Sequence, residues 1–203
     1  MSTTVETLRL VLVSSGSTGR ELLAETGLEF VVVAPQIEKP AGLASKLGAV
    51  QRAEAAAYFN ARVVAERVLD ACVVGVETVV AVGRRVLSRP VGRLEAADML
   101  RALSGRRHAV VSGVALVEHG TTRLIASEIT YVTLLPMTEA DIATHLASGR
   151  WVGQAGGYAL DEMGDRFVLS IEGSLSNARG LPVELVGRMI DEIRHRPDAH
   201  RFA

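Results

Sequence analysis

A run of small polar residues, Ser14-Ser15-Gly16-Ser17-Thr18-Gly19-Arg20, has the composition of an anion-binding loop. It follows an apolar stretch and precedes a segment with helical spacing, so its backbone N–H groups would lie at the positive end of a helix dipole. No lysine follows the last glycine, which excludes a Walker-type phosphate loop. The alternative is a tight connection in which Ser17 or Thr18 is an ordinary helix N-cap. The composition alone leaves both interpretations open.

Glu77 is the second candidate, because it lies between two apolar runs at residues 71–76 and 79–82. We expect a break between two strand segments at or near this residue. A carboxylate in such a place is paired, protonated or directed at a metal ion in a cleft. The alternative is a glutamate at a strand end in solvent. Arg89, before Pro90, is a candidate phosphate ligand, although a lone arginine is more often a surface residue.

Two polar loops punctuated by glycine, at residues 156–158 and 172–177, are weaker candidates for lining a pocket. The five histidines show no metal-ligand spacing, and Cys72 lies in an apolar segment, which predicts an inert core thiol. Zinc and cysteine-nucleophile chemistry are therefore not expected. A single cysteine also excludes a disulfide within the chain.

Strands and helices that would position these residues alternate in the first half of the chain. Apolar runs predict strands at residues 8–13, 29–33, 71–76, 79–82, 108–117, 124–135 and 167–171. Spacings near three and four predict helices at residues 20–25, 43–69, 93–103, 138–146 and from 181–182 to near Arg194. A capping pair, Thr138 and Asp141, opens the fourth helix, and residues 119–121 form a hairpin turn. The fold class is α/β, with a mixed sheet flanked by helices.

The composition excludes several classes of protein. The chain has 203 residues, 48% of them hydrophobic, with 22 basic against 23 acidic side chains, which predicts one globular domain with a frayed tail at about 196–203. Near-zero net charge gives no basic field, so nucleic-acid binding is not expected. No apolar run approaches the roughly 20 residues that span a bilayer, and no secretion signal begins the chain. We expect a cytoplasmic protein without a membrane partner.

Six blocks of the sequence, from about residue 8 to 190, resemble the Maf family in order and spacing. LVSSGSTGRELL follows the family's L-A-S-x-S-P-R-R-x-E-L-L, and GVETVV follows G-A-D-T-V-V. VLSRPVGRLEAADMLRALSGRRHAVVSGVAL, QAGGYALDEMG and IEGSLSNARGLPVELV follow the later blocks. The resemblance implies two lobes with a central cleft, a fold related to the inosine-triphosphate pyrophosphatases. It also implies hydrolysis of a nucleoside triphosphate to the monophosphate and pyrophosphate, with Mg²⁺ or Mn²⁺, in a homodimer.

The framework of the motifs is kept, whereas their polar residues are substituted. The family's two arginines are replaced by Thr18 and Gly19, and its later lysine before Ala-Gly is replaced by Gln154. The remaining matched positions are occupied by Glu38-Lys39, Asn60, Glu77, Arg89 and Asp161. The family pattern carries five cations and two carboxylates, whereas this chain has Lys39 and Arg89 against Glu77 and Asp161. Each lost charged hydrogen bond is worth roughly 1.5–3 kcal/mol.

Two hypotheses follow from the resemblance and its departures. In the first, the chain is a Maf-like pyrophosphatase in which Glu77 holds the metal ion and water, and Arg89 with Lys39 neutralises the phosphates. The loop would bind phosphate through Ser14, Ser17 and Thr18, with Arg20 replacing the missing arginines, and Gln154 and Asp161 would complete the substrate site. In the second, the chain is a non-catalytic homologue that binds nucleotides or other proteins.

Overall fold

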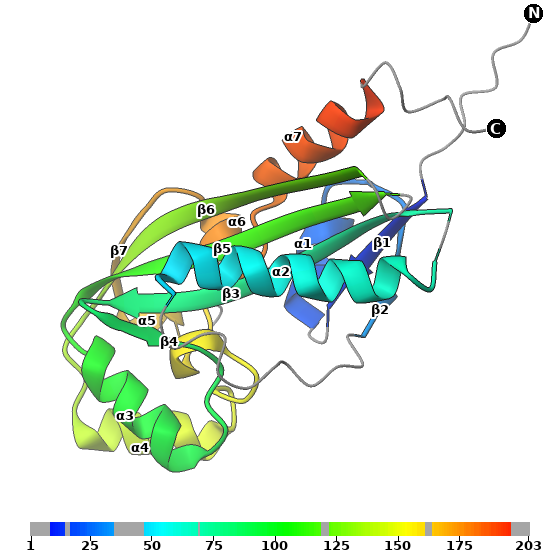
Figure 1. The fold of residues 1–203 in the computed structure, drawn as a ribbon. Coiled ribbons are helices and arrows are strands. Elements are labelled where there is room, and N and C mark those ends of the chain that lie inside the picture. The colour runs from blue at the N-terminus through cyan, green and yellow to red at the C-terminus, as the bar shows by residue number, and fades with distance from the viewer. Residues whose placement is uncertain are drawn as a thin grey trace, which may run out of the picture.

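The computed structural model describes residues 9–14, 17–34, 47–68, 70–118, 122–160 and 164–195. In these residues a seven-stranded mixed sheet has the order β2-β1-β3-β5-β6-β7, and β4 pairs with β3 (Figure 1). The strands are β1 (Leu10–Val13), β2 (Phe30–Val33), β3 (Cys72–Val82), β4 (Arg85–Leu87), β5 (Arg107–Glu118), β6 (Thr122–Leu134) and β7 (Val168–Glu172). β1 is parallel to β2 and β3, whereas the later pairs are antiparallel. The predicted α/β class with a mixed sheet is therefore confirmed.

Helices lie on both faces of this sheet and at one end of it. They are α1 (Ser17–Ala24), α2 (Ala49–Ala65), α3 (Arg93–Leu103), α4 (Glu139–Ser148), the 3-10 turn η1 (Ala155–Gly157), α5 (Gly164–Phe167), α6 (Leu175–Ala178) and α7 (Val183–Arg194). None of these described helices combines the length and the apolar character that crossing a membrane requires.

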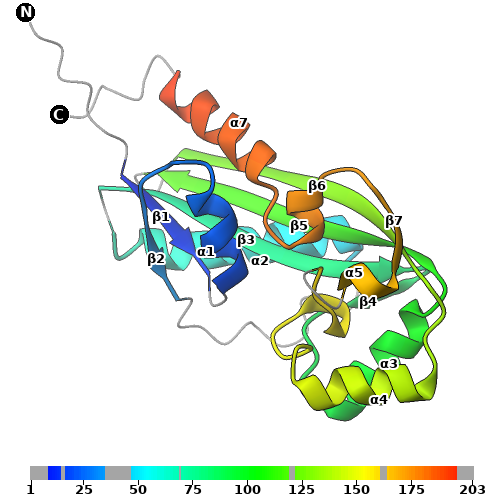
Figure 2. The ribbon, with the colours of Figure 1, turned by 180° about the vertical axis from the view of Figure 1, so that it is seen from behind.

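Helix α2 covers one face of the sheet, and its alanines approach the strands closely. A Cβ atom on Gly75 of β3 would lie 2.3 Å from the carbonyl oxygen of Ala57, and one on Gly113 of β5 would lie 2.3 Å from the carbonyl carbon of Ala53. Only glycine therefore allows the helix to sit at this depth. The opposite face carries α1 and α7, which pack their leucines and isoleucines against β1, β3 and β5 (Figure 2).

The helices α3 and α4 and the turn η1 form a second lobe around the far end of the long strands. Its core contains Val80 and Val82 of β3, Leu100 and Leu103 of α3, and Leu146 of α4. The first lobe holds β1, β2, α1 and α7, whose apolar side chains form a separate cluster. Both views show α3 and α4 at the end of the sheet away from α7 (Figures 1 and 2). The expected two-lobed arrangement is present.

Several predicted elements are reproduced and others differ. Helix α3 has the predicted bounds, and Thr138 with Asp141 forms the predicted capping box of α4. The β5–β6 hairpin is confirmed, although its turn at 119–121 lies outside the described residues. Helix α1 begins at Ser17 instead of Arg20, and α2 covers Ala49–Ala65 instead of 43–69, with 43–46 and 69 outside the described residues. The short elements β4, η1, α5 and α6 are absent from the predicted set.

The predicted break at Glu77 is wrong. Strand β3 runs from Cys72 to Val82 without interruption, and Glu77 pairs with Gly113 of β5 in an unbroken register. The pairing with β5 therefore keeps β3 extended through this polar residue. The predicted tail at 196–203 lies outside the described residues.

Candidate functional site

Strand β3 has an open edge midway along its length. Strand β1 pairs with β3 only up to Gly75, and β4 begins to pair at Val80. Among the described residues, positions 76–79 of β3 therefore pair only with β5, on the other side. This gap leaves room for ligand beside the end of a parallel strand, where α/β sheets commonly bind ligands.

A cavity of about 550 Å³ lies at this open edge, between the two lobes. The β1–α1 connection lines it from the first lobe, and residues 152–155 and 158–160 around η1 line it from the second. The polar and charged side chains of the lining are Ser14, Thr18, Asn60, Glu77, Thr78, Arg89, Gln154, Tyr158 and Arg179. The fold thus brings together five predicted site residues: Ser14, Thr18, Glu77, Arg89 and Gln154.

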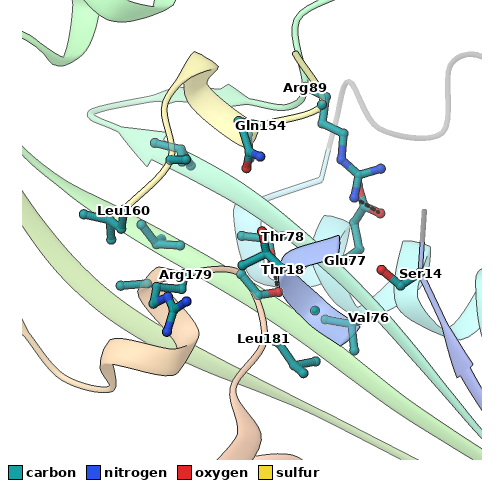
Figure 3. A pocket seen from close by; sticks show the side chains of 18 of the residues that line it. Ser14, Thr18, Val76, Glu77, Thr78, Arg89, Gln154, Leu160, Arg179 and Leu181 are labelled. Carbon is teal, nitrogen blue, oxygen red and sulfur yellow. Dashed lines mark hydrogen bonds and ion pairs between the residues drawn. The ribbon is translucent and has the colours of Figure 1, made fainter. Parts of the chain in front are cut away.

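Glu77 is buried inside this cavity, with 4% of its surface exposed. Strand alternation places it on the same face as Val73, which packs against α2, so its side chain lies on the side of Asn60 of that helix. Arg89 approaches it from the segment after β4, with 3.9 Å between Nη2 and Oε2 (Figure 3). Glu77 is therefore a buried, paired carboxylate, and the alternative of a strand-end glutamate in solvent is wrong.

Thr78, the next residue, ties a distant turn to this strand. Its hydroxyl donates a hydrogen bond to the carbonyl oxygen of Gly180 at 3.1 Å, and it lies 2.8 Å from the hydroxyl of Ser112. Gly180 has φ of 102°, a conformation that favours glycine. The turn after α6, which carries Arg179, is consequently fixed one residue away from Glu77 in β3.

The predicted phosphate loop contributes only part of its length to the cavity. Ser14 follows β1, and its backbone N–H donates to the carbonyl of Val33 at 3.1 Å. Thr18 and Gly19 line the cavity from the first turn of α1. Ser17 and Arg20 are exposed and are not among the lining residues. Lys39 and Asp161, together with Ser15 and Gly16, lie outside the described residues.

Gln154 is held at the cavity by a turn rich in hydrogen bonds. Gly156 and Gly157 both have positive φ, and the N–H of Gly156 donates to the carbonyl of Ser88 at 3.1 Å. The buried His145 donates from Nε2 to the carbonyl of Gly157 at 2.7 Å. Of the two glycine-punctuated loops predicted to line a pocket, 156–158 does so through Tyr158, whereas residues 172–177 are not part of this cavity's lining.

A second buried histidine, His108, contacts the same loop through Tyr158. Nε2 of His108 lies 2.5 Å from the hydroxyl of Tyr158. Burial lowers the pKa of His108 to about 4 and raises the pKa of Tyr158 above its usual value, so both groups are neutral at neutral pH. Both histidines therefore position the loop. Burial also raises the pKa of Cys72 to about 12, which agrees with an inert core thiol.

Sequence reasoning missed one charged residue of the cavity. Arg179 lies in the block I-x-G-x-x-x-N-V-x-G-L-P, at a position where the motif accepts any residue. A motif gives no signal at its variable positions, so only the folded turn reveals that this side chain lines the cavity.

Comparisons with known proteins agree with this architecture. The family model described as Maf-like protein matches residues 9–193. The dTTP/UTP pyrophosphatase of Ruminiclostridium cellulolyticum is 32% identical over 92% of this chain and 97% of its own. That of Moorella thermoacetica is 36% identical over 90% of this chain and 93% of its own. A HAM1 protein from Coxiella burnetii has a similar fold, with a TM-score of 0.50 at 17% identity over 91% of this chain and 99% of its own. The chain belongs to the Maf-like protein family.

Proposed function

We propose that this protein hydrolyses a nucleoside triphosphate to the nucleoside monophosphate and pyrophosphate. The observation that carries the proposal is the buried Glu77, which faces Arg89 at the open edge of β3 in a cavity between two lobes. Relatives of similar length are named dTTP/UTP pyrophosphatases, which supports the same reaction class. Water attacks the α-phosphorus, the bond to the oxygen that bridges the α- and β-phosphates breaks, and pyrophosphate leaves.

The triphosphate would lie at the end of the cavity formed by Ser14, the first turn of α1 and Arg89. The N–H groups at the start of a helix are free to bind anions, and the helix dipole favours negative charge there. The guanidinium of Arg89 is 3.9 Å from Glu77, longer than a hydrogen bond, and its side chain is 42% exposed. Its donors can therefore turn to a phosphate without breaking a close contact.

A divalent cation fits this site through Glu77. Among the described residues no three His, Cys, Asp or Glu side chains are grouped as a metal site, and Glu77 is the acidic member of the described lining. Mg²⁺ at nucleotide sites usually takes one or two carboxylates and completes its shell with phosphate oxygens and water, so one buried carboxylate is sufficient. When bound, Mg²⁺ or Mn²⁺ would neutralise phosphate charge and make water more acidic.

The side chains of this protein would then act on the water and on the leaving group. Glu77 accepts a hydrogen bond from the attacking water and orients it, because its buried carboxylate has few competing solvent contacts. Arg89 donates to the phosphate oxygens on which negative charge develops. Thr78 keeps the backbone beside Glu77 fixed through its bond to Gly180. Lys39 and Asp161 stay predicted contributors, whereas Arg20 is exposed on α1 and does not line the described cavity.

Pyrophosphate release from a panel of nucleoside triphosphates, with Mg²⁺ or Mn²⁺, tests the proposal. Glu77→Gln should lower kcat/KM by about 100-fold or more, because it removes a group that acts on the water. Glu25→Gln is the matched control, since Glu25 is exposed beyond the end of α1 and does not line the cavity. Unchanged turnover in Glu77→Gln would contradict the assigned role. Nucleotide binding without any turnover by the wild type would support a non-catalytic homologue.

Two further expectations from the sequence stay predictions: the homodimer that the resemblance implies, and the cytoplasmic location. A homodimer would give twice the chain mass in light scattering after size exclusion, whereas a monomer would give 21.6 kDa. A cytoplasmic location is tested by fractionating the source cells.

A further inference from the structure

The described lining of the cavity includes two arginines, and they lie at opposite ends of it. Figure 3 shows Arg89 beside Glu77 at one end and Arg179 near Leu160 at the other, with Thr18 and Thr78 between them. Arg89 is paired with the carboxylate of Glu77. Within the described part of the chain, no hydrogen-bond or ion-pair partner is recorded for the guanidinium of Arg179. Its donors are therefore available to a ligand.

The backbone under Arg179 is held rigidly. Its N–H donates to the carbonyl of Leu175 at 3.0 Å, and the next carbonyl, of Gly180, accepts from Thr78. The preceding turn is fixed by Asn177, which is fully buried and whose Nδ2 donates to the carbonyl of Val110 at 3.2 Å and to Thr130 Oγ1 at 3.0 Å. A rigid support of this kind reduces the entropy lost when a side chain binds a ligand.

The surroundings of Arg179 are apolar, unlike those of Arg89. Leu181 is 1% exposed, Leu160 is 7% exposed, and the lining beside them includes Val110 and Ala178. The hydroxyl of Tyr158 is already bonded to His108. Apolar walls with one or two fixed polar groups are typical of sites for flat organic rings. The first turn of α1, whose N–H groups suit phosphate, lines the cavity through Thr18, between the two arginines (Figure 3).

From this separation we infer that Arg179 recognises the nucleobase and selects bases with a keto oxygen at position 4 of a pyrimidine or position 6 of a purine. The inference rests on the proposed function, since it assigns the two ends of that site. A guanidinium has only donors, so it pairs with O4 of uracil or thymine, or with O6 and N7 of guanine. The amino groups of cytosine and adenine are donors at the same positions and would face the guanidinium unpaired. The preference expected is about tenfold or more.

Binding of nucleoside monophosphates tests the inference without requiring hydrolysis. Titration calorimetry would compare UMP with CMP and GMP with AMP, and inorganic pyrophosphate would serve as a ligand without a base. The wild type should prefer UMP and GMP by about tenfold. Arg179→Met keeps the length of the side chain and removes the donors, so its preference should approach unity while pyrophosphate affinity stays unchanged. Arg67→Met, at an exposed position beyond α2, should behave as the wild type.

Three results would overturn the inference. The first is a wild type that binds all four monophosphates equally or binds none of them. The second is a loss of pyrophosphate affinity in Arg179→Met as large as the loss for UMP, which would make Arg179 a phosphate ligand. The third is an unchanged preference in both Arg179→Met and Arg179→Gln. A keto preference in a protein that turns over no triphosphate would reject the proposed function and keep this inference.

Discussion

Restoring one cation of the family pattern should raise the activity of this protein. Gln154 lines the cavity at the position where the family has lysine. Its backbone is fixed on both sides, because its N–H donates to the carbonyl of Trp151 at 3.2 Å and its carbonyl accepts from Gly157 at 3.0 Å. Gln154→Lys would therefore place an ammonium group at a defined point of the cavity wall.

The size of the gain follows from the partial exposure of this position. A hydrogen bond to a charged group contributes roughly 1.5–3 kcal/mol, and screening by water favours the lower value here. Gln154 is half-buried, so a lysine there keeps part of its hydration. About 1.5 kcal/mol corresponds to a gain of roughly tenfold in kcat/KM. Asn60→Lys would gain less, because Asn60 is 4% exposed and a lysine ammonium group there would lose its hydration.

Steady-state pyrophosphate release at low and high salt measures this effect. Gln154→Met is the matched control, because it has a similar length without the charge. We expect the lysine variant to exceed both the wild type and the methionine variant at low salt, and the difference to shrink as salt screens the charge. An equal gain in both variants, or none in Gln154→Lys, would refute the view that lost cations limit this site.

Three further predictions concern the scaffold. Gly113→Ala should lower the free energy of unfolding by about 2–3 kcal/mol in urea, since its Cβ would meet the backbone of Ala53, whereas Gly187→Ala on α7 meets nothing within 4 Å and should be neutral or stabilising. Because burial lowers the pKa of His108 from 6.5 to about 4, the unfolded state binds the proton first, and stability should fall by about 3 kcal/mol from pH 6.5 to 4; His108→Gln should flatten that slope in urea titrations. Thr78→Val removes the bond to Gly180 and should weaken UMP binding more than pyrophosphate binding, measured by calorimetry.

Local signals in the sequence predicted those elements whose ends are fixed by neighbouring residues. Helix α3 ends before Ser104 and Gly105, and α4 is opened by its capping box and closed by Gly149 in the left-handed conformation. The burial of Cys72 also follows from its apolar neighbours. Interactions close in sequence specify such features, so one sequence is enough to predict them.

The shape of the site depends on pairings between distant segments, which the sequence pattern does not contain. A glutamate between two apolar runs predicts a break, yet β5 pairs along β3 through Gly113 and keeps the strand continuous. The opening beside Glu77 arises because β1 stops at Val13 and β4 starts later, on the same edge. Similarly, Ser17 and Arg20 fall in the predicted loop but are exposed on α1, because the helix starts three residues early.

The positions of the charges in the cavity show why a sum of charges over the motif positions underestimates the ability of this site to bind an anionic substrate. A sum of the charges at the matched motif positions gives equal numbers of cations and carboxylates, and it ignores where they lie. In the described lining, Glu77 and Arg89 lie together and Arg179 lies apart from them. Coulomb interactions fall with distance and are screened, so the Glu77–Arg89 pair leaves Arg179 positively charged toward its own end of the cavity. A substrate with a charged end and a flat, keto-bearing end would match both regions at once. The distribution of charge along the cavity, more than its sum, therefore determines what this protein can bind.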